Sequence, residues 1–313
     1  MALFKKEIKT DNKALKILFK ILPIAFDWLI IYFIWEIKAF IYSRIDVFER
    51  KFSIYDESIS YPYKKPIEKV NWYTLLHYTL TICSIIIVII QLLKCYDKVN
   101  YGINNLHLAL LGLFLSYLIT NTFVDYIKNF AGRYRPDFLT VCDVDFKKVE
   151  EQFQHYRNLT GGVDIENYGP RNLFDTSICR CDRSEIPEEQ KSFPSGHTAF
   201  AFSTMVYISL YFAGQLHMFK GKCPAWKILI VCVPFFASFY VPFTRVSDYR
   251  HHWEDVLAGA IIGSFFAVIV YYLMYPKLTD PDCDIPYRGD KRKEKKVKVD
   301  ELEEDDLPQE QIV

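Results

Sequence analysis

Six apolar segments constrain what this chain can fold into more than any other feature of its sequence. Each approaches the roughly 20 residues that a helix needs to cross a lipid bilayer. They cover residues 22–42, 72–93, 106–127, 198–219, 225–243 and 256–275. Hydrophobic residues make up 51% of the 313 positions, and a soluble domain would not gather them in such long runs. The sequence therefore predicts an all-α integral membrane protein with six transmembrane helices in a bundle.

The last and the first of these segments differ most in polarity. The last contains an uncharged run, AGAIIGSFFAVIVYYLMY, whose small residues allow neighbouring helices to approach closely: Ala258, Gly259, Ala260 and Gly263. The first is interrupted by Asp27, Glu36 and Lys38. Because a charge inside a span is costly, we expect these side chains to face protein or water, unless Asp27 marks the inner end of the span.

An even number of spans places both termini on one side of the membrane. The short loops on that side are basic and carry Lys94, Lys98, Lys220, Lys222 and Lys227, which favours cytoplasmic termini. The opposite loop, residues 43–71, also carries six Lys and Arg, so charge alone does not decide the orientation. The N-glycosylation sequon at Asn158 falls in a long loop that this topology places outside, although lone sequons also occur by chance.

The chain divides into three parts at the ends of the apolar region. Residues 1–21 form a cytoplasmic segment in this topology, and its first sixteen residues are polar and basic without a cleavage site after a short apolar core, so we expect no removable signal peptide. Residues 22–276 form the six-span domain, with a long outer loop at 128–195. Residues 277–313 form a cytoplasmic tail whose basic block and acidic block predict solvation and disorder. The formal net charge is zero, which gives no overall attraction to nucleic acid.

Three cysteines fall in the outer loop, which faces an oxidising compartment in a secretory-pathway protein. Cys142 is a candidate for a disulfide with either Cys179 or Cys181, and free thiols are the alternative.

Three short motifs carry the chemistry, and the predicted topology places all of them on the same non-cytoplasmic face. They are KNFAGRYRP at residues 128–136, PSGH at 194–197 and RVSDYRHHWED at 245–255. Each lies beside an apolar segment. The Lys, Arg and His residues of these motifs favour binding of a phosphate. A phosphate site at the edge of a membrane indicates an amphiphilic substrate, in which a phosphate is attached to an apolar tail.

The third motif predicts a nucleophile. His251 and Asp255 are four residues apart and would share one face of a helix. A carboxylate that accepts from Nδ1–H would fix the tautomer and leave Nε2 free to attack phosphorus. Arg245 lies six residues earlier, where its guanidinium can bind two phosphate oxygens.

The other two motifs supply an acid and positive groups. The Ser195 hydroxyl and the Gly196 amide begin a helix, and its positive dipole end favours an anion. His197 is then placed to protonate the leaving alkoxide and later to deprotonate water. Lys128 and Arg135 add positive charge. With one carboxylate in the set, the residues imply no metal and no other cofactor.

Each of these residues also has a structural interpretation. Lone histidines near helix ends usually lie in the core or at the surface, which is how we interpret His77, His107, His155, His217 and His252. Lys128 and Arg133 could simply extend to lipid headgroups. PSGH alone could be a turn before any helix. The three motifs in order and on one face favour a functional site instead.

Together, the motifs resemble those of the type 2 phosphatidic acid phosphatase superfamily, and within it the lipid phosphate phosphatases. The resemblance extends from residue 22 to 276 and includes the segments FSIYDESISYPY at 52–63 and RPDFLTVC at 135–142. DYRHH and RPDFL look similar to fungal diacylglycerol pyrophosphate phosphatases. One departure is Thr244, where the family usually has Ser, and the hydroxyl is kept.

The resemblance implies a metal-independent enzyme in the plasma membrane or an endomembrane such as vacuole, Golgi or endoplasmic reticulum, with a lumenal or extracellular site. His251 would be the nucleophile, Asp255 its orienting partner and His197 the acid and base. The phosphate would be bound by Lys128, Arg135, Ser195, Gly196 and Arg245. The implied substrates are phosphatidate, lysophosphatidate, diacylglycerol pyrophosphate and sphingoid phosphates.

Three alternatives stay open from sequence. A phosphohistidine intermediate trapped by an alcohol would make a lipid phosphotransferase. A polyprenyl pyrophosphate phosphatase would use the same motifs. A non-enzymatic membrane scaffold that binds lipid phosphates would be expected to lose His251 or His197, and neither is lost. The sequence does not decide whether the chain forms a homo-oligomer.

Overall fold

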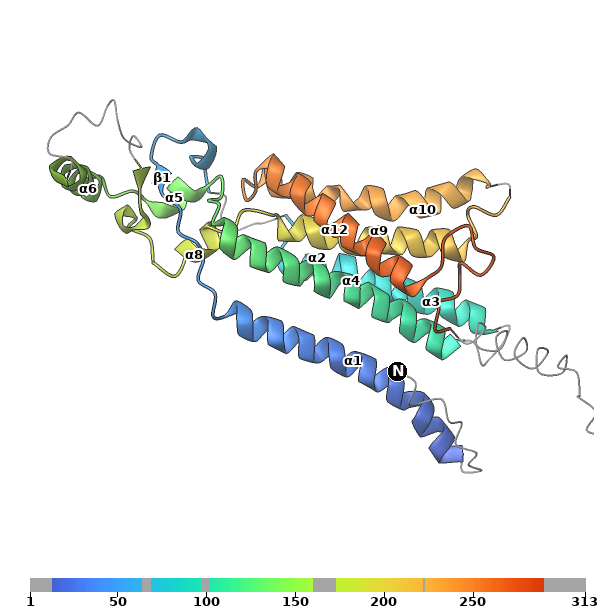
Figure 1. The fold of residues 1–313 in the computed structure, drawn as a ribbon. Helices are drawn as coiled ribbons and strands as arrows, with labels where there is room; N and C mark the ends of the chain where they lie inside the picture. The colour runs from blue at the N-terminus through green and yellow to red at the C-terminus, as the bar shows by residue number, and fades with distance from the viewer. Residues whose placement is uncertain (1–12, 64–68, 97–101, 160–172, 222, 290–313) are drawn as a thin grey trace, which may run out of the picture.

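The computed structural model describes the whole chain except residues 1–12, 64–68, 97–101, 160–172, 222 and 290–313. A long bundle of helices carries a smaller region at one end, which we call the cap (Figure 1). The bundle contains α1 (Lys13–Tyr42), α2 (Trp72–Leu76), η2 (His77–Thr81), α3 (Ile82–Tyr96), α4 (Gly102–Ala131), α9 (Gly196–Gln215), α10 (Ala225–Ser238), α11 (Tyr240–Ser247) and α12 (Trp253–Met274). The cap contains β1 (Phe52–Ser53), η1 (Glu57–Ile59), α5 (Phe138–Cys142), α6 (Phe146–Leu159), β2 (Leu173–Phe174), η4 (Thr176–Ile178) and α8 (Ile186–Glu189).

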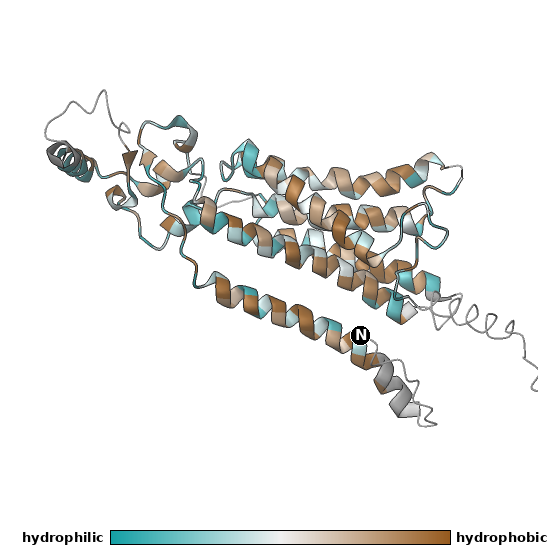
Figure 2. Cartoon of the chain, in the orientation of Figure 1, coloured by the Kyte–Doolittle hydropathy of each residue, from teal (hydrophilic) through white to brown (hydrophobic). Residues whose placement is uncertain are grey.

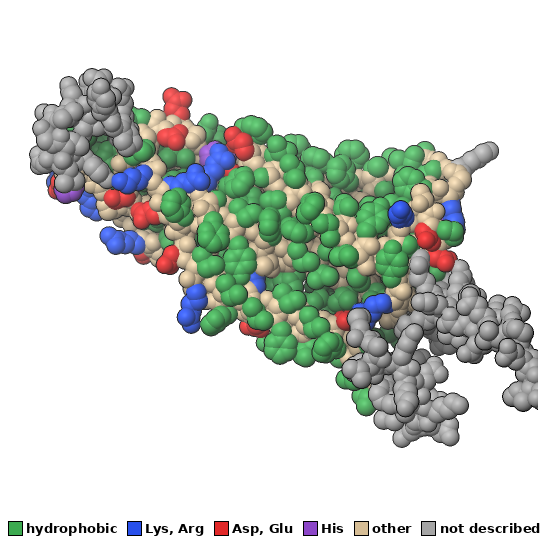
Figure 3. Space-filling model, in the orientation of Figure 1, with side chains coloured by type: hydrophobic (Ala, Val, Ile, Leu, Met, Phe, Trp, Pro, Cys, Tyr) green, Lys and Arg blue, Asp and Glu red, His purple; other side chains and the backbone are tan. Residues whose placement is uncertain are grey.

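Part of the predicted membrane topology is visible in the bundle. Among the described residues, four helical stretches are long and apolar enough to cross a membrane: Trp72–Lys94, Ile103–Ala131, Ala225–Ser247 and Trp253–Met274. The first joins α2, η2 and α3, and the third joins α10 and α11. Apolar residues dominate these helices (Figure 2), and apolar side chains cover the face of the bundle seen in Figure 3. The other two predicted spans correspond to α1 and α9, which are long helices outside this group of four.

Helix α9 lies at the centre of the bundle and packs against α12, α10 and α4. Helix α12 approaches it so closely that no side chain fits at two glycines. A Cβ added to Gly259 would lie 2.6 Å from the Ser195 carbonyl oxygen, and one added to Gly263 would lie 2.2 Å from that of Ala199. The predicted role of these small residues in close helix packing is confirmed.

Helix α1 contacts the bundle through polar side chains that the sequence marked as unusual for a span. Asp27 pairs with His107 of α4 at 3.1 Å, and Lys38 pairs with Asp125 of α4 at 2.5 Å. The expectation that these two charges face protein is confirmed. Many apolar side chains of α1 are exposed, but Trp28 also packs edge to face against His107 and Phe114 of α4.

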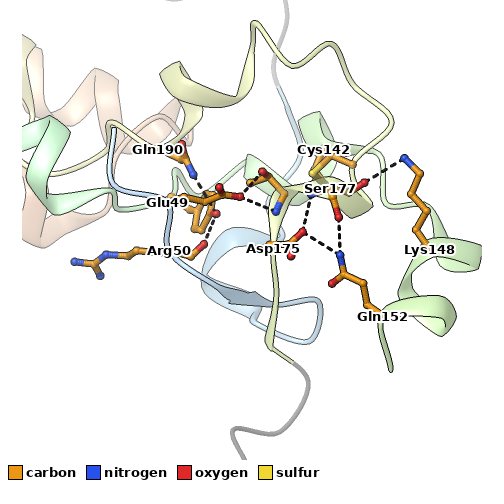
Figure 4. The surroundings of a disulfide bond; sticks show 11 residues. Glu49, Arg50, Cys142, Lys148, Gln152, Asp175, Ser177 and Gln190 are labelled. Carbon is orange, nitrogen blue, oxygen red and sulfur yellow. Dashed lines mark hydrogen bonds between the residues drawn. A yellow bond between two sulfur atoms is a disulfide. The ribbon is translucent and has the colours of Figure 1, made fainter. Parts of the chain in front are cut away.

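The cap has a small apolar core of its own. Its buried side chains include Phe52, Ile59, Tyr134, Phe138, Phe174 and Ile178. Cys142 and Cys179 form a disulfide within this core, with their Cα atoms 4.7 Å apart (Figure 4). This is one of the two pairings that the sequence left open, and Cys181 is a free cysteine.

The residues after α12 return to pack on the opposite end of the bundle from the cap. Cys283 and Ile285 are buried, Asp284 pairs with Lys94 at 3.0 Å, and Arg288 pairs with Asp27 at 3.0 Å. The folded region therefore reaches residue 289 and includes the start of the predicted tail at 277. The rest of that tail and the first twelve residues lie outside the described part of the chain.

Candidate active site

The three motifs meet at the end of the bundle that carries the cap (Figure 1). Lys128 lies in the last turn of α4, PSGH begins α9, and the third motif runs from α11 into α12. Arg245, Lys128 and Arg135 are near enough to His197 for their charges to act on it, and His251 is a further neighbour. Segments far apart in sequence thus bring their cationic groups into one site.

Ser195 starts α9 and ties it to α12. The Ser195 hydroxyl accepts a hydrogen bond from the Thr198 amide at 3.4 Å, and the Ser195 amide donates to the Asp255 carbonyl at 2.9 Å. The Lys128 ammonium lies against Gly196, where an added Cβ would be 3.1 Å from Nζ. An ammonium beside the positive end of a helix dipole is a favourable place for an anion.

Lys128 is unusual among the cations of the site. Its ammonium has no hydrogen-bond or ion-pair partner among the described residues. A positive charge without a counterion inside a protein is costly, so this group is suited to bind an anionic ligand.

Arg135 has its guanidinium fixed by the cap and by the third motif. Its Nε donates to the Glu188 carbonyl at 3.0 Å, and its Nη2 pairs with the Glu188 carboxylate at 2.5 Å. Its Nη1 donates to the Arg250 carbonyl at 3.4 Å. The Glu188 side chain is 59% exposed, whereas that of Arg135 is 7% exposed.

Arg245 lies deep in the protein, with 1% of its surface exposed. Its Nη2 donates to Asp248 at 3.1 Å, and Asp248 in turn accepts from the Lys69 amide at 3.1 Å. This pairing sets the direction of the guanidinium.

His251 lies in the turn before α12, where it is 3% exposed. Its Nδ1 is 2.8 Å from the Ser192 carbonyl oxygen, which can only accept a hydrogen bond. Nδ1 therefore carries the proton, and Nε2 keeps its lone pair. Burial lowers the pKa of His251 to about 3, and the positive charges of Arg135 and Lys128 add to this effect. The ring is neutral at physiological pH, as a nucleophile must be.

The predicted geometry of His251 and Asp255 is wrong. The two residues do not share a helical face, because α12 begins at Trp253 and His251 precedes it. Their closest approach is 3.9 Å, between Nδ1 and Oδ2, which is beyond hydrogen-bonding distance. The Ser192 carbonyl takes the place that the sequence assigned to Asp255.

Asp255 instead organises the residues around His251. It pairs with Arg133 at 2.7 Å, accepts from the Ser192 hydroxyl at 2.5 Å, and accepts from the His252 amide at 3.0 Å. His252 caps α12, and its ring Nδ1 is 3.2 Å from the same carboxylate. Besides its 3.9 Å approach to His251 Nδ1, Asp255 thus contacts two residues that surround His251, Ser192 and His252.

Two residues of this network were missed from sequence. Ser192 was not considered, and Arg133 was interpreted as a candidate for contact with lipid headgroups. Both residues reach Asp255 from loops, and the spacing of residues along the sequence does not predict the conformation of a loop. The sequence HHWED did contain one signal: a polar residue three positions before an acidic one is the pattern of a helix-capping box.

His197 lies in the first turn of α9, beside Trp72. The two rings meet edge to face, with centroids 5.8 Å apart. The His197 Nε2 atom is buried and has no hydrogen-bond partner among the described residues. A proton-transfer role requires such an available nitrogen.

Two further predictions concern a metal and glycosylation. Within the described ranges, no three His, Cys, Asp or Glu residues converge as metal ligands. Metal independence stays a prediction. Asn158 lies in the last turn of α6, but its side chain is outside the described part of the structure.

Comparison with known proteins gives consistent matches. The family model of the PAP2 superfamily matches residues 109–278. The probable diacylglycerol pyrophosphate phosphatase 1 of Schizosaccharomyces pombe is 32% identical over 77% of both chains. The diacylglycerol pyrophosphate phosphatase 1 of Saccharomyces cerevisiae is 31% identical over 75% of this chain and 74% of its own. The lipid phosphate phosphatase 2 of Arabidopsis thaliana is 35% identical, but the match spans only 58% of that protein's length. No solved structure matches the chain.

Proposed function

The chain belongs to the PAP2 superfamily, and we propose that it is a membrane enzyme that hydrolyses lipid phosphates through a phosphohistidine intermediate. The family prediction made from the motifs is confirmed. The relatives named as lipid phosphate and diacylglycerol pyrophosphate phosphatases support the same activity here. The candidate substrates are phosphatidate, lysophosphatidate, diacylglycerol pyrophosphate and sphingoid phosphates.

The observation that carries this proposal is the state of His251. A hydrogen bond of 2.8 Å to the Ser192 carbonyl fixes its proton on Nδ1, and its burial keeps the ring neutral. Nε2 can therefore form a bond to phosphorus while the lipid oxygen departs with the electron pair of the broken P–O bond. The Nδ1–H contact to a carbonyl also accommodates the positive charge that the ring gains.

His197 would act on the two oxygens that leave or enter. It first gives a proton to the departing lipid alkoxide. It then takes a proton from a water molecule that attacks phosphorus, and the P–N bond breaks with its electrons returning to His251. Lys128, Arg135, Arg245, Ser195 and Gly196 would hold the equatorial oxygens throughout.

We also propose the complete predicted topology. Helices α1 and α9 would span the membrane beside the four apolar helices, since α9 is enclosed by α12, α10 and α4 and α1 lies along α4. Six spans would place both termini in the cytosol and the cap, including Asn158, in the lumen or outside the cell. The site would then act on the outer or lumenal leaflet of the plasma membrane or an endomembrane.

A panel assay tests the function. Purified protein in mixed micelles should release phosphate from diacylglycerol pyrophosphate, phosphatidate and lysophosphatidate with a chelator present. A polyprenyl pyrophosphate and an acceptor alcohol belong in the same panel, because they reveal the rival substrate class and transferase activity. Absence of phosphate release from every lipid phosphate, by protein that is monodisperse, would refute the proposal.

Sealed vesicles of known orientation test the topology. Protease added on the cytosolic side should remove the tail around 291–298 and spare activity. Cleavage near Asn158 from that side would contradict the proposed orientation.

A further inference from the structure

The turn that carries His251 has an unfavourable backbone conformation. We call residues 248–252 the His251 loop. Tyr249 has φ = +56°, in the left-handed region that side chains other than Gly rarely adopt. Such a conformation persists where the surroundings impose it. Contacts with the surrounding protein must therefore hold the His251 loop in the shape that directs His251.

One segment far away in sequence makes three contacts with the His251 loop. This segment is residues 52–63, which we call the strap. The Tyr61 ring stacks on the Tyr249 ring, with centroids 4.8 Å apart and planes at 18°. The Arg250 guanidinium lies over the Tyr63 ring at 5.8 Å. The Ser58 carbonyl oxygen is 3.1 Å from His252 Nε2.

The strap, which includes β1 and η1, is fixed to the rest of the cap. The Tyr61 amide donates to the Pro136 carbonyl at 2.9 Å, and the Tyr61 carbonyl accepts from the Thr140 hydroxyl at 2.8 Å. Phe52 packs edge to face on Phe138 of the cap core, at 4.9 Å between centroids. The strap therefore offers the loop a surface that is held in place from the other side.

The cap also holds the loop through charge. Arg250 pairs with Asp137 at 3.0 Å and with Glu189 at 3.1 Å, and all three side chains are buried. The two residues next to His251 in sequence are thus both held by the cap: Arg250 by these ion pairs and His252 by the Ser58 carbonyl. The Ser192 carbonyl then fixes only the ring of His251.

We infer that the strap is a positioning element for the His251 loop, with the Tyr61–Tyr249 stack as its principal contact. This inference rests on the proposed function for its effect on turnover. The aromatic stack stabilises the left-handed turn at Tyr249, and the turn presents Nε2 of His251 to the phosphate. None of the strap residues needs to touch substrate.

The test compares Tyr61→Leu with Tyr61→Phe and Tyr55→Leu. Tyr55 lies in the same segment and is 73% exposed, so its replacement is a matched control. Misplacing a reacting group by about 1 Å costs on the order of 100-fold in rate. We expect Tyr61→Leu to lower kcat by at least about tenfold and to change KM by less than about twofold. Tyr61→Phe keeps the stack and should retain turnover, as should Tyr55→Leu.

Amide hydrogen exchange in detergent gives a second readout that does not need activity. The amides of Asp248, Tyr249 and Arg250 donate to carbonyls of α11. They should exchange several times faster in Tyr61→Leu than in the parent, Tyr61→Phe or Tyr55→Leu. Tyr249→Gly adopts the positive φ without the stack, so adding Tyr61→Leu to it should change kcat little.

Several results would overturn the inference. If Tyr61→Leu left both kcat and the amide hydrogen exchange of residues 248–250 unchanged, the Tyr61–Tyr249 stack would not be what stabilises the His251 loop. A raised KM with normal kcat would make Tyr61 a substrate-binding residue instead. Faster exchange throughout the bundle would indicate a general loss of stability. If the parent released no phosphate from any lipid, the proposed function would fail, while loop exchange would still decide the role of the strap.

Discussion

The two ends of the bundle both gather charged residues, but they use them differently. At the end away from the cap, cations meet carboxylates: Lys94 with Asp284 and Arg288 with Asp27, each at 3.0 Å. At the cap end, Lys128 has no such partner among the described residues, and the partner of Arg135 is a largely exposed carboxylate. Other cations at the cap end are paired as well: Arg133 with Asp255, Arg245 with Asp248 and Arg250 with Asp137. The difference between the ends is therefore confined to Lys128 and Arg135, which under the proposed function would meet the substrate phosphate.

The largest expected effect tests the reactive end directly. His251→Ala removes the proposed nucleophile and should lower turnover by roughly 10⁴-fold or more. Phosphate release from micelles measures it, and gel filtration confirms that the variant is folded. Turnover close to that of the parent would remove His251 from the mechanism.

A pair of lysine variants compares the two ends. Lys128→Met should lower kcat/KM by about 100-fold, because it removes a cation from the developing phosphate charge. Lys94→Met, at the other end, breaks only the ion pair with Asp284 and should change kcat/KM by less than about twofold. If both variants lost the same factor in kcat/KM, the difference in ion pairing between Lys128 and Lys94 would have no bearing on catalysis.

His197→Ala separates the acid from the nucleophile. We expect a loss of about 100-fold or more on a lipid phosphate, whose alkoxide needs a proton to leave. An aryl phosphate with an activated leaving group should be much less affected. The same loss on both substrates would argue against an acid role for His197.

A smaller effect is expected at the displaceable partner of Arg135. Glu188→Gln removes the carboxylate that occupies Nη2, so substrate phosphate meets less competition. KM should fall by about two- to fivefold, as for loss of an exposed ion pair. A raised KM would show that Glu188 helps to form the site rather than competing for it.

The last effect concerns stability against pH, and it is spread over several pH units. Burial lowers the pKa of folded His251 to about 3, whereas an unfolded His has a pKa near its ordinary value. The unfolded chain therefore binds the extra proton first, and stability falls as pH drops from about 6.5 towards 3, by at most about 1.4 kcal/mol per unit. His251→Gln should flatten this part of the curve of melting temperature against pH. An unchanged slope would mean that other groups dominate acid unfolding.

The motif residues of the candidate site could be named from the sequence, because their types and spacing suit the chemistry of phosphate transfer. The apolar segments placed the motifs at helix ends, and the structure gathers those ends together. Small residues such as Gly259 and Gly263 also indicated the close packing of α12, which follows directly from their lack of side chains.

The partner of His251 could not be predicted, because it depends on where a helix begins. A four-residue spacing implies a shared face only inside a helix, and α12 starts two residues after His251. Tyr249 has a positive φ, and His252 is the N-cap residue of helix α12. Between them, the His251 ring lies against the Ser192 carbonyl. These features arise from contacts with residues far away in sequence, such as Tyr61, and local patterns do not contain them.

The disulfide of the cap has a consequence for how the chain can vary. Cys142 and Cys179 fix the two ends of an excursion of the chain at a Cα separation of 4.7 Å. Part of the chain between them belongs to the cap itself: β2 pairs with β1, and Phe174 and Ile178 lie in the cap core. Residues added between the cysteines would leave Arg135 on one side and Ser192 on the other in place only if this packing were kept. A fluorescent label attached to an exposed side chain of α6, which also lies between the two cysteines, could report the sidedness of the enzyme.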